Sequence, residues 1–398
     1  MLTSAKKVNP AKPVAGRILH QFLRHRAAAL PSVPLFAERV DSFAAVELTR
    51  MGDLIASTYA INALQKAIPD TQIFIITRKI YKSLAAALVS NATVEGISNG
   101  TPIRTFLEAR AKLRAIGPTF TCSMSVGRLN SLAALASGSK FIGGYLAFEG
   151  TKAPYLHATR TESFGFPTTL GSVQPARLST RPGVLLDMMG LSQSLMPNKL
   201  VLNPEMLAAA RSTLREGISL PAKRYVVIHP FSGWEYRNWP IEHYQELIQR
   251  IVSADELPEV IVVAEEQQRE LALRLFGRLK KPERAHLYLS RDLLTSAVLI
   301  HDAELYIGND SGPLHLAAAF GVPAVGLYGP AGPEQTGPVS YDSALFRAMY
   351  FEFPCSPCAQ EFCPHGDRWC MTRITVNDVS TAVRQLLSSH RSSSATHA

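Results

Sequence analysis

The sequence has few charged residues, no long apolar run, and no acidic residue among its first 37 positions. Charged residues make up 18% and hydrophobic residues 46% of the 398 positions, a balance typical of a globular chain rather than a disordered one. No uninterrupted apolar run approaches the roughly 18–20 residues that span a bilayer, so we expect no transmembrane helix. The length fits two domains of ordinary size.

Two further absences narrow the function. No Gly-x-Gly-x-x-Gly turn follows the first expected strand, which argues against a Rossmann-type oxidoreductase. Beyond the start of the chain the basic residues are scattered, with no stripe that alternates with aromatic residues, so we expect no nucleic-acid partner. The net charge of +9 still favours anionic partners such as phosphates or an acidic membrane face.

The two ends of the chain differ from the rest. Residues 1–37 hold six Lys or Arg, and Glu38 is the first acid. We therefore expect residues 1–40 to be a basic N-terminal extension. Within it, residues 16–30 form either a short amphipathic helix suited to an anionic membrane surface or a solvated basic segment. Residues 387–398 are polar and predict a disordered tail.

Between these ends, strand-like and helix-like segments alternate, which predicts βαβ units and parallel sheets. In a first series we expect strands at residues 43–48, 72–76 and 120–124, with a turn at residues 51–53 and a helix over residues 54–67. The pattern loosens over residues 148–203, apart from a helical stretch at residues 183–190. We place acceptor-side loops and the connection between domains in this region.

The second series is more regular. We expect helices over residues 240–251, 267–279, 293–300 and 311–320, with Pro240 as the first helical residue, and strands at residues 224–228, 259–263, 303–307 and 323–327. The predicted fold class is α/β, with two Rossmann-like domains whose parallel sheets face a central cleft. The N-terminal domain spans residues 41–203 and the C-terminal domain spans residues 204–386.

The strongest chemical signal is the segment Gly308-Asn309-Asp310-Ser311-Gly312-Pro313-Leu314-His315. Ligands of open α/β sheets bind at the carboxyl ends of strands, where the N-terminus of the next helix favours a pyrophosphate. Asp310 or Ser311 can cap that helix, Gly312 lets the backbone approach a ligand, and His315 reaches the same place one turn later. An ordinary capped helix with a buried histidine is an equally good interpretation.

Two other loops follow strand ends and therefore face the same cleft. In the loop His229–Pro240, Ser232 can donate to a phosphate and Arg237 can pair with it in a bidentate manner, although an arginine in a loop is more often solvated. In Arg50-Met51-Gly52-Asp53, Asp53 is placed either as a general base for an acceptor hydroxyl or as the N-cap of the next helix. Position alone favours the cap.

Four of the five cysteines lie close together near the C-terminus. Their spacing fits either a structural zinc site or two local disulfides, and the cellular compartment decides between them. Cys122 stands alone in an expected strand and is interpreted as a buried core residue. The clustered cysteines are Cys355, Cys358, Cys363 and Cys370.

Taken in order, these segments resemble glycosyltransferase family 9, the heptosyltransferases that build the inner core of bacterial lipopolysaccharide. The resemblance extends from about Val46 to Val379. It rests on Gly52-Asp53 with residues 60–69, on Arg237-Asn238-Trp239-Pro240, and on residues 309–323 continuing through residues 336–338. The cysteine cluster also looks like one found near the C-terminus of many members.

The resemblance implies a GT-B fold, with an acceptor-binding N-terminal domain (residues 41–203) and a donor-binding C-terminal domain (residues 204–386). It also implies an inverting, metal-independent transfer of heptose from ADP-L-glycero-D-manno-heptose to a lipopolysaccharide inner-core acceptor, without a cofactor. The absence of an Asp-x-Asp motif at a strand end agrees with metal independence. By position, Asp53 matches the proposed catalytic base, and Glu265 (or Glu266, in another register) matches an acidic residue near the donor nucleoside. The residues implied in donor binding are Ser232, Arg237, Glu265, Asp310, Ser311, Gly312 and His315.

The implied partners are the nucleotide-sugar donor and a lipid-linked oligosaccharide acceptor, with peripheral contact to an anionic membrane face. The implied location is the cytoplasm, at the inner face of the plasma membrane. One alternative is a family 9 transferase that uses another nucleotide-sugar on a different glycan, and a second is a non-catalytic nucleotide-binding protein. Convergence of Asp53, Arg237 and Asp310 on one cleft is expected of the enzyme.

Overall fold

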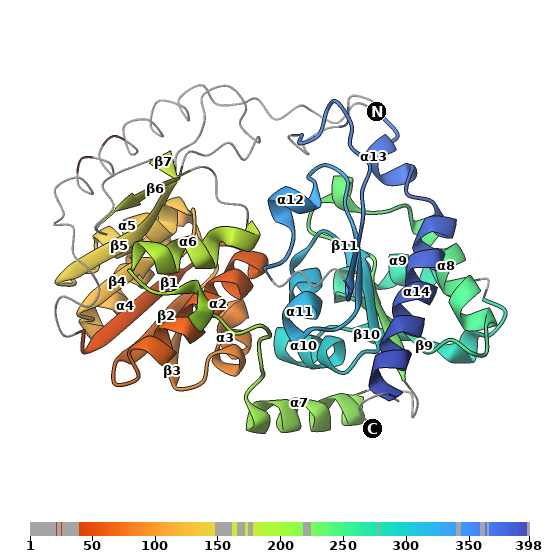
Figure 1. The fold of residues 1–398 in the computed structure, drawn as a ribbon, viewed down its shortest axis with the longest axis horizontal. Coiled ribbons are helices and arrows are strands. Elements are labelled where there is room, and N and C mark those ends of the chain that lie inside the picture. Colours follow the sequence, from red (N-terminus) through yellow and green to blue (C-terminus); the bar gives the residue numbers. More distant parts are fainter. Residues whose placement is uncertain are drawn as a thin grey trace.

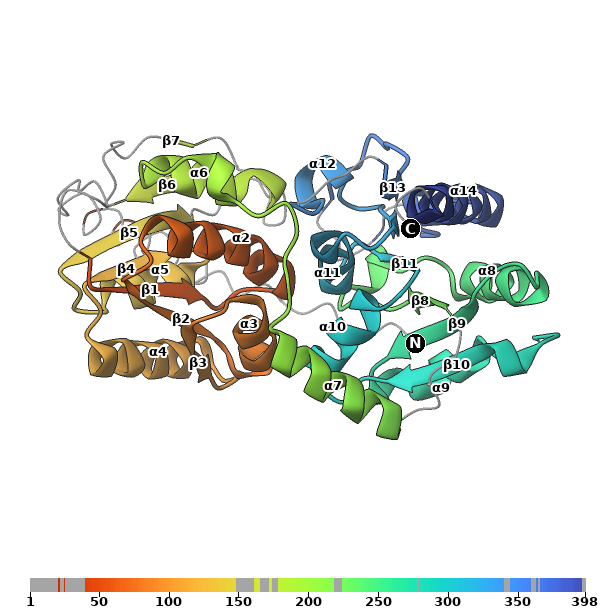
Figure 2. The same ribbon diagram turned by 60° about the horizontal axis from the view of Figure 1, so that its bottom comes forward.

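The computed structural model describes residues 21, 25, 40–147, 161–164, 172–173, 178–217, 224–277, 279–339, 344–358, 363 and 366–395. These residues form two α/β halves that lie side by side, each on its own sheet (Figures 1 and 2). Of the expected N-terminal extension, only Gln21, His25 and residue 40 are described; the first two are helical, and the rest of residues 16–30 lies outside the described part. No helix among the described residues is long and apolar enough to cross a membrane.

The N-terminal half is built on a sheet with the strand order β3-β2-β1-β4-β5-β6-β7. The pairs from β3 to β5 are parallel, and β6 and β7 add an antiparallel edge that the sequence does not predict. The central strand β1 is almost wholly buried because helices cover both faces of a parallel sheet. The strands are β1 (Ser42–Glu47), β2 (Gln72–Arg78), β3 (Ala92–Ile97), β4 (Phe120–Ser123), β5 (Phe141–Ala147), β6 (Thr161–Phe164) and β7 (Ser172–Val173).

Helices α2 to α5 connect strands that follow one another in the sequence, and α6 comes after β7. Helix α2 begins at Met51, so the turn expected at residues 51–53 is wrong: these residues form the first turn of the helix. The helix expected over residues 183–190 is confirmed as α6, which packs against α2. The helices are α2 (Met51–Ala67), α3 (Lys82–Leu88), α4 (Pro102–Ile116), α5 (Arg128–Leu135) and α6 (Arg181–Met188), with the 3-10 turn η1 (Lys79–Tyr81) before α3.

The C-terminal half has a wholly parallel sheet in the order β10-β9-β8-β11-β12-β13. Counted from its first strand, this is the 3-2-1-4-5-6 order of a Rossmann fold, in which ligands bind between the first and fourth strands at their carboxyl ends. Strands β8 and β11 therefore hold the expected site. The strands are β8 (Tyr225–His229), β9 (Glu259–Ala264), β10 (Ala285–Leu289), β11 (Leu305–Asn309), β12 (Ala324–Leu327) and β13 (Phe346–Met349).

Helices cover both faces of the second sheet. Pro240 is the N-cap of α8 rather than its first helical residue, and α9 is shorter than the helix expected over residues 267–279. The last helix extends to Ala395 and its Leu387 is buried, so most of the tail expected to be disordered is helical. The helices are α7 (Pro204–Gly217), α8 (Ile241–Ser253), α9 (Arg269–Arg274), α10 (Leu293–His301), α11 (Gly312–Phe320), α12 (Pro333–Thr336), α13 (Trp369–Thr372) and α14 (Val376–Ala395).

The segment between the two halves forms backbone hydrogen bonds with both of them. Leu200 donates its backbone N–H to Ala319 in α11 at 2.8 Å, and Asn203 donates to Ala87 in α3 at 2.7 Å. Helix α7, which follows, packs against α10, and α10 in turn contacts α3. The two sheets are thus joined by backbone hydrogen bonds as well as by side-chain packing. The division of the chain at residues 203 and 204 stays a prediction.

Candidate active site

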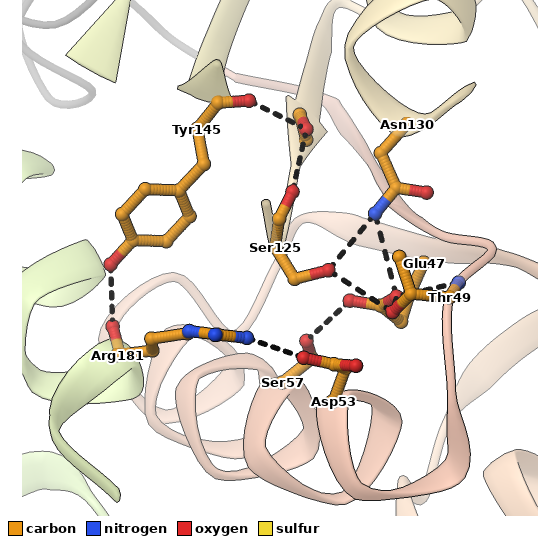
Figure 3. A network of polar contacts seen from close by, with 9 residues as sticks. Glu47, Thr49, Asp53, Ser57, Ser125, Asn130, Tyr145 and Arg181 are labelled. Atoms are coloured by element: carbon orange, nitrogen blue, oxygen red, sulfur yellow. Dashed lines mark hydrogen bonds and ion pairs between the residues drawn. The ribbon is translucent and has the colours of Figure 1, made fainter. Parts of the chain in front are cut away.

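Asp53 lies in the first turn of α2, just beyond the carboxyl end of β1. Arg50 holds the N-cap position with extended backbone, and no side chain caps the helix there, so the interpretation of Asp53 as N-cap is wrong. The Asp53 carboxylate instead forms an ion pair with Arg181 at the start of α6 (Figure 3). Both side chains are 18% exposed, which leaves this carboxylate within reach of a ligand.

A second carboxylate, Glu47, lies behind Asp53 at the end of β1 and is 1% exposed. Its Oε1 accepts hydrogen bonds from the backbone N–H of Thr49, at 3.0 Å, and from the Thr49 hydroxyl. Its Oε2 accepts from Ser57 at 3.0 Å, and Asn130 Nδ2 lies 3.4 Å from Oε1 (Figure 3). Four donors from three segments therefore surround one buried carboxylate.

The environment of Glu47 changes its acidity. Burial raises the pKa of Glu47, and the nearby charge of Asp53 raises it further, while the hydrogen bonds from Ser125 and Thr49 act in the opposite direction. Sequence reasoning missed Glu47 because it stands in an apolar strand with no polar motif beside it. The signal that could have found it is the acid itself, since an unpaired carboxylate is rare in a buried parallel strand.

Asp310 is buried directly after β11 and pairs with a cation from the neighbouring loop. Its Oδ2 lies 2.9 Å from Arg237 Nη1 and accepts a 2.9 Å hydrogen bond from the Thr336 hydroxyl. The side chains of Arg237 and Asp310 are only 10% and 4% exposed. Asp310 is thus held by an ion pair rather than serving as the cap of α11.

Helix α11 begins at Gly312, with Ser311 at the N-cap. The Ser311 side chain makes no capping hydrogen bond, so capping by Asp310 or Ser311, expected from the sequence, does not occur. The positive end of the helix dipole at this N-terminus favours a negatively charged ligand. The pyrophosphate site expected at Ser311 and Gly312 stays a prediction.

The loop after β8 is organised by two amides that the sequence analysis gave no role. The Ser232 hydroxyl lies 2.8 Å from Asn238 Oδ1 and 2.7 Å from the Trp234 carbonyl, so it is turned into its own loop. Asn309 Oδ1 accepts from Trp239 N–H and from the Tyr244 hydroxyl, both at 3.0 Å. Asn309 therefore ties this loop and α8 to the end of β11.

The two halves meet where α2 and α11 begin. A Cβ on Gly52 would lie 3.2 Å from Cδ2 and 3.3 Å from Nε2 of His315, and a Cβ on Gly312 would lie 2.8 Å from Cβ of Met51. Burial lowers the pKa of His315, Asp310 and Asp53 act in the opposite direction, and Arg237 lowers it further. The predicted residues Asp53, Arg237, Asp310 and His315 thus converge on one place.

Trp234 lies at the same contact, between two arginines. The guanidinium carbon of Arg50 is 4.9 Å from the centre of the Trp234 ring, and that of Arg237 is 5.6 Å from it. Burial lowers the pKa of Arg50, and the charge of Arg237 lowers it further, so the two cations are close enough to repel each other. A polyanion between them would relieve this repulsion.

Glu265 and Glu266 do not join this cluster through any contact among the described residues. Both are exposed at the end of β9, where Glu265 belongs to the capping box of the turn at residues 266–268. Glu266 pairs with Arg269 at 2.6 Å. The strand end itself is next to β8, so the site predicted for the nucleoside stays a prediction.

The four C-terminal cysteines lie near one another, and none of them forms a disulfide. Burial raises the pKa of Cys370 to about 11, followed by smaller contributions from the other three cysteines, which places all four near one another. No described cysteine forms a disulfide, so neither expected local disulfide is present, and Cys122 is buried as predicted. Within the described part of the chain, no group of three or more His, Cys, Asp or Glu side chains is arranged to hold a metal ion. The zinc hypothesis gains no support there.

Two Rossmann-type sheets, joined so that the site residues of both meet at the carboxyl ends of their strands, define a GT-B fold. Solved structures agree with it. The match to "Structure of E. coli ADP-heptose lps heptosyltransferase II" has a TM-score of 0.61 at 17% identity and covers 87% of this chain and 98% of that one. The match to the glycosyl transferase family 9 structure from Veillonella parvula DSM 2008 has a TM-score of 0.67 at 15% identity and covers 89% and 99%.

Residues 183–367 match the family model of glycosyltransferase family 9 (heptosyltransferase). Among curated proteins, lipopolysaccharide heptosyltransferase 2 of Escherichia coli (strain K12) is 31% identical over 116 residues, which are 28% of this chain and 33% of that protein. The match thus spans about a third of the length of that relative. These matches show that residues 183–367 are similar to glycosyltransferase family 9, and the solved structures show the shared fold.

Proposed function

We propose that the protein is an inverting, metal-independent glycosyltransferase that moves a heptose from ADP-L-glycero-D-manno-heptose to a lipopolysaccharide inner-core acceptor. The observation that carries the proposal is the meeting of Asp53 with Arg237, Asp310 and His315 at one contact between the two sheets. A nucleotide-binding protein without catalysis has no need of a partly exposed carboxylate opposite its nucleotide site.

In this proposal Asp53 is the general base. The acceptor hydroxyl attacks the anomeric carbon, Asp53 takes the hydroxyl proton, and the bond between that carbon and the diphosphate oxygen breaks, releasing ADP. The ion pair with Arg181 fixes the carboxylate, and Arg181 must give way or turn as the proton arrives. A group of this kind contributes roughly 10²–10⁴-fold to the rate.

The departing diphosphate is stabilised by the second half. Arg237, the N-terminus of α11 at Ser311 and Gly312, and Arg50 beyond Trp234 supply positive charge and N–H donors around one point. Ser232, Glu265 and His315 complete the proposed donor site. In the proposal these groups carry the charge stabilisation that a divalent metal provides in other transferases, with ADP-heptose as donor and no cofactor.

The proposal is tested by a transfer assay with ADP-heptose and truncated lipopolysaccharide acceptors, read by mass spectrometry. Asp53→Asn is expected to lower kcat by at least about a hundredfold while donor affinity by calorimetry changes less than about twofold. Asp70→Asn, an exposed aspartate beyond the end of α2, is the matched control. Loss of donor binding in Asp53→Asn would instead support a structural role for Asp53.

Metal independence, inversion at the anomeric carbon and the choice of donor are each tested by a separate measurement. Transfer should persist in EDTA, and the product anomer, read by NMR, should be inverted relative to the donor. Tighter binding of a uridine nucleotide-sugar than of ADP-heptose would overturn the choice of sugar donor and favour the family 9 alternative with another glycan.

A further inference from the structure

Helix α4 (Pro102–Ile116) exposes apolar side chains where a soluble helix usually presents polar ones. Its inner face is buried in the N-terminal half through Thr105, Ala109 and Leu113. On the outer face Ile103 is 72% and Leu107 is 51% exposed, and Ala111 continues the row at the same spacing. Residues four positions apart lie on one side of a helix, so these three form an apolar stripe turned to solvent.

Arginines border this stripe. Arg104 and Arg114 are exposed and Arg110 is half-buried, and none of the three forms an ion pair with an acid among the described residues. The acid of this helix, Glu108, is held by Ser98, whose N–H lies 3.1 Å from its Oε2. Apolar and cationic side chains thus share one exposed surface, and the one acid of α4 is hydrogen-bonded to Ser98.

The surface continues onto the turn η1 (Lys79–Tyr81). Strands β2 and β3 are paired, with Arg78 opposite Ile97, so η1 and the loop before α4 leave neighbouring strands at the same edge of the sheet. Arg78 Nη1 lies 3.4 Å from Asn99 Oδ1 and joins these two segments. Ile80 is 53% exposed in this turn, and Lys79 beside it is exposed. We call Lys79, Ile80, Ile103, Arg104, Leu107 and Arg114 the α4 face.

We propose that the α4 face seats the protein on an anionic lipid surface. An apolar stripe bordered by arginines is the pattern of helices that lie in a membrane interface, where the apolar chains enter the acyl boundary and the cations meet the headgroups. The turn η1 and the start of α4 lie at the carboxyl edge of the sheet that also carries Asp53 after β1, and α4 then runs back along the sheet to the start of β4. Under the proposed function, a lipid-linked acceptor held in that surface would face the same edge as the base.

The positive charge of the α4 face favours a lipid surface over a protein partner. A protein partner in a stable complex would supply acids opposite the arginines and hydrogen-bond partners at the rim of the interface. Binding of such a protein would not depend on the headgroup charge of lipid vesicles. An anionic bilayer satisfies the cations without any specific geometry. Binding should therefore depend on both lipid charge and ionic strength.

The test is co-sedimentation of the full chain with vesicles of phosphatidylglycerol and phosphatidylethanolamine, and with vesicles of phosphatidylcholine alone. The double variant Ile103→Asp/Leu107→Asp should lose at least about tenfold in partitioning to the anionic vesicles. The matched control is Val201→Asp/Leu273→Asp, whose positions are 74% and 51% exposed elsewhere on the protein. Arg104→Gln should weaken binding about fivefold at low salt.

Equal sedimentation of the double variant and its control would overturn the proposal, as would equal binding to both kinds of vesicle. Circular dichroism checks that each variant is folded, which is expected because all four positions are exposed. Transfer to a soluble truncated acceptor should be unchanged in the Ile103→Asp/Leu107→Asp variant. If vesicle binding follows the prediction but no transfer is detected with any protein, the proposed function fails and the lipid-binding surface stands.

Discussion

His315 in α11 lies against Gly52 in α2, so the two halves of the molecule touch through the backbone of one glycine. A Cβ at position 52 would stand 3.2 Å from Cδ2 and 3.3 Å from Nε2 of the imidazole. Residue 52 is helical, so its backbone conformation does not itself require glycine. Glycine is needed because His315 of α11 approaches the backbone closely at this position. Asp53, the next residue, is therefore positioned by the same contact that brings His315 to the start of α2.

Gly52→Ala should lower the kcat of transfer severalfold and the free energy of unfolding only modestly. The added methyl has to displace His315 by a few tenths of an ångström, and a crowded contact of this kind costs about 1–3 kcal/mol. We expect kcat to fall severalfold because the geometry of a base one residue away is altered. The comparison is Gly233→Ala, where a Cβ meets no atom within 4 Å. Similar kinetics and similar Tm shifts for the two variants would contradict this account.

The convergence of Asp53, Arg237, Asp310 and His315 was predictable because all of them follow strands or begin helices at carboxyl ends, which face a common edge in parallel sheets. Arg181 was not predictable, because it belongs to a region with little periodic pattern and reaches Asp53 across 128 positions of sequence. The Glu47 network was not predictable for a similar reason, since its donors come from the loop after β1, from α2 and from α5.

Helix starts were the least predictable feature of the fold. The strands expected from apolar runs are present, but α2 starts three residues before its expected beginning at Leu54. Glycine is a poor helix former, and position 52 was therefore assigned to a turn. The packing of α2 against α11 and α6 outweighs that intrinsic preference, and this contact is visible only in the folded molecule.

Arg181→Ala should reduce kcat without weakening donor binding. The ion pair fixes Asp53 from α6, and its loss lets the carboxylate rotate away from the acceptor hydroxyl, with an expected loss of about tenfold or more. Arg181→Lys should recover part of the rate, because lysine keeps the charge but not the planar geometry. Arg211→Ala, which removes a surface ion pair with Asp302, is the control for losing one arginine. An increase in the donor Kd for Arg181→Ala would place Arg181 in the donor site instead.

Glu47→Gln should change how stability depends on pH. Burial raises the pKa of Glu47 above its ordinary value of 4.5, so between these two values the folded protein binds more protons than the unfolded chain. The contribution of Glu47 to stability is therefore fully present below the unfolded pKa and is lost as the pH rises through the folded pKa. The stability of the wild type minus that of Glu47→Gln should fall as pH rises from about 4 to about 7, measured by urea unfolding. Glu205→Gln, an exposed carboxyl in α7, controls for the change in net charge, and a difference that rises over this range would refute the assignment.

The Arg237–Asp310 pair should show strong coupling in a double-mutant cycle. Asp310→Asn leaves the guanidinium, in a side chain 10% exposed, without its charged partner, and the expected loss is about 3–5 kcal/mol of unfolding free energy. The double variant Arg237→Met/Asp310→Asn removes the unpaired charge and should regain much of that stability, while donor affinity remains low because Arg237 is the proposed diphosphate ligand. Two measurements distinguish the two roles of Arg237. Urea unfolding measures the contribution of the ion pair to stability, and calorimetry with ADP measures the contribution of Arg237 to donor affinity. Additive losses of stability in the double variant would mean that the pair contributes little to the fold. Wild-type ADP affinity in it would remove Arg237 from the donor site.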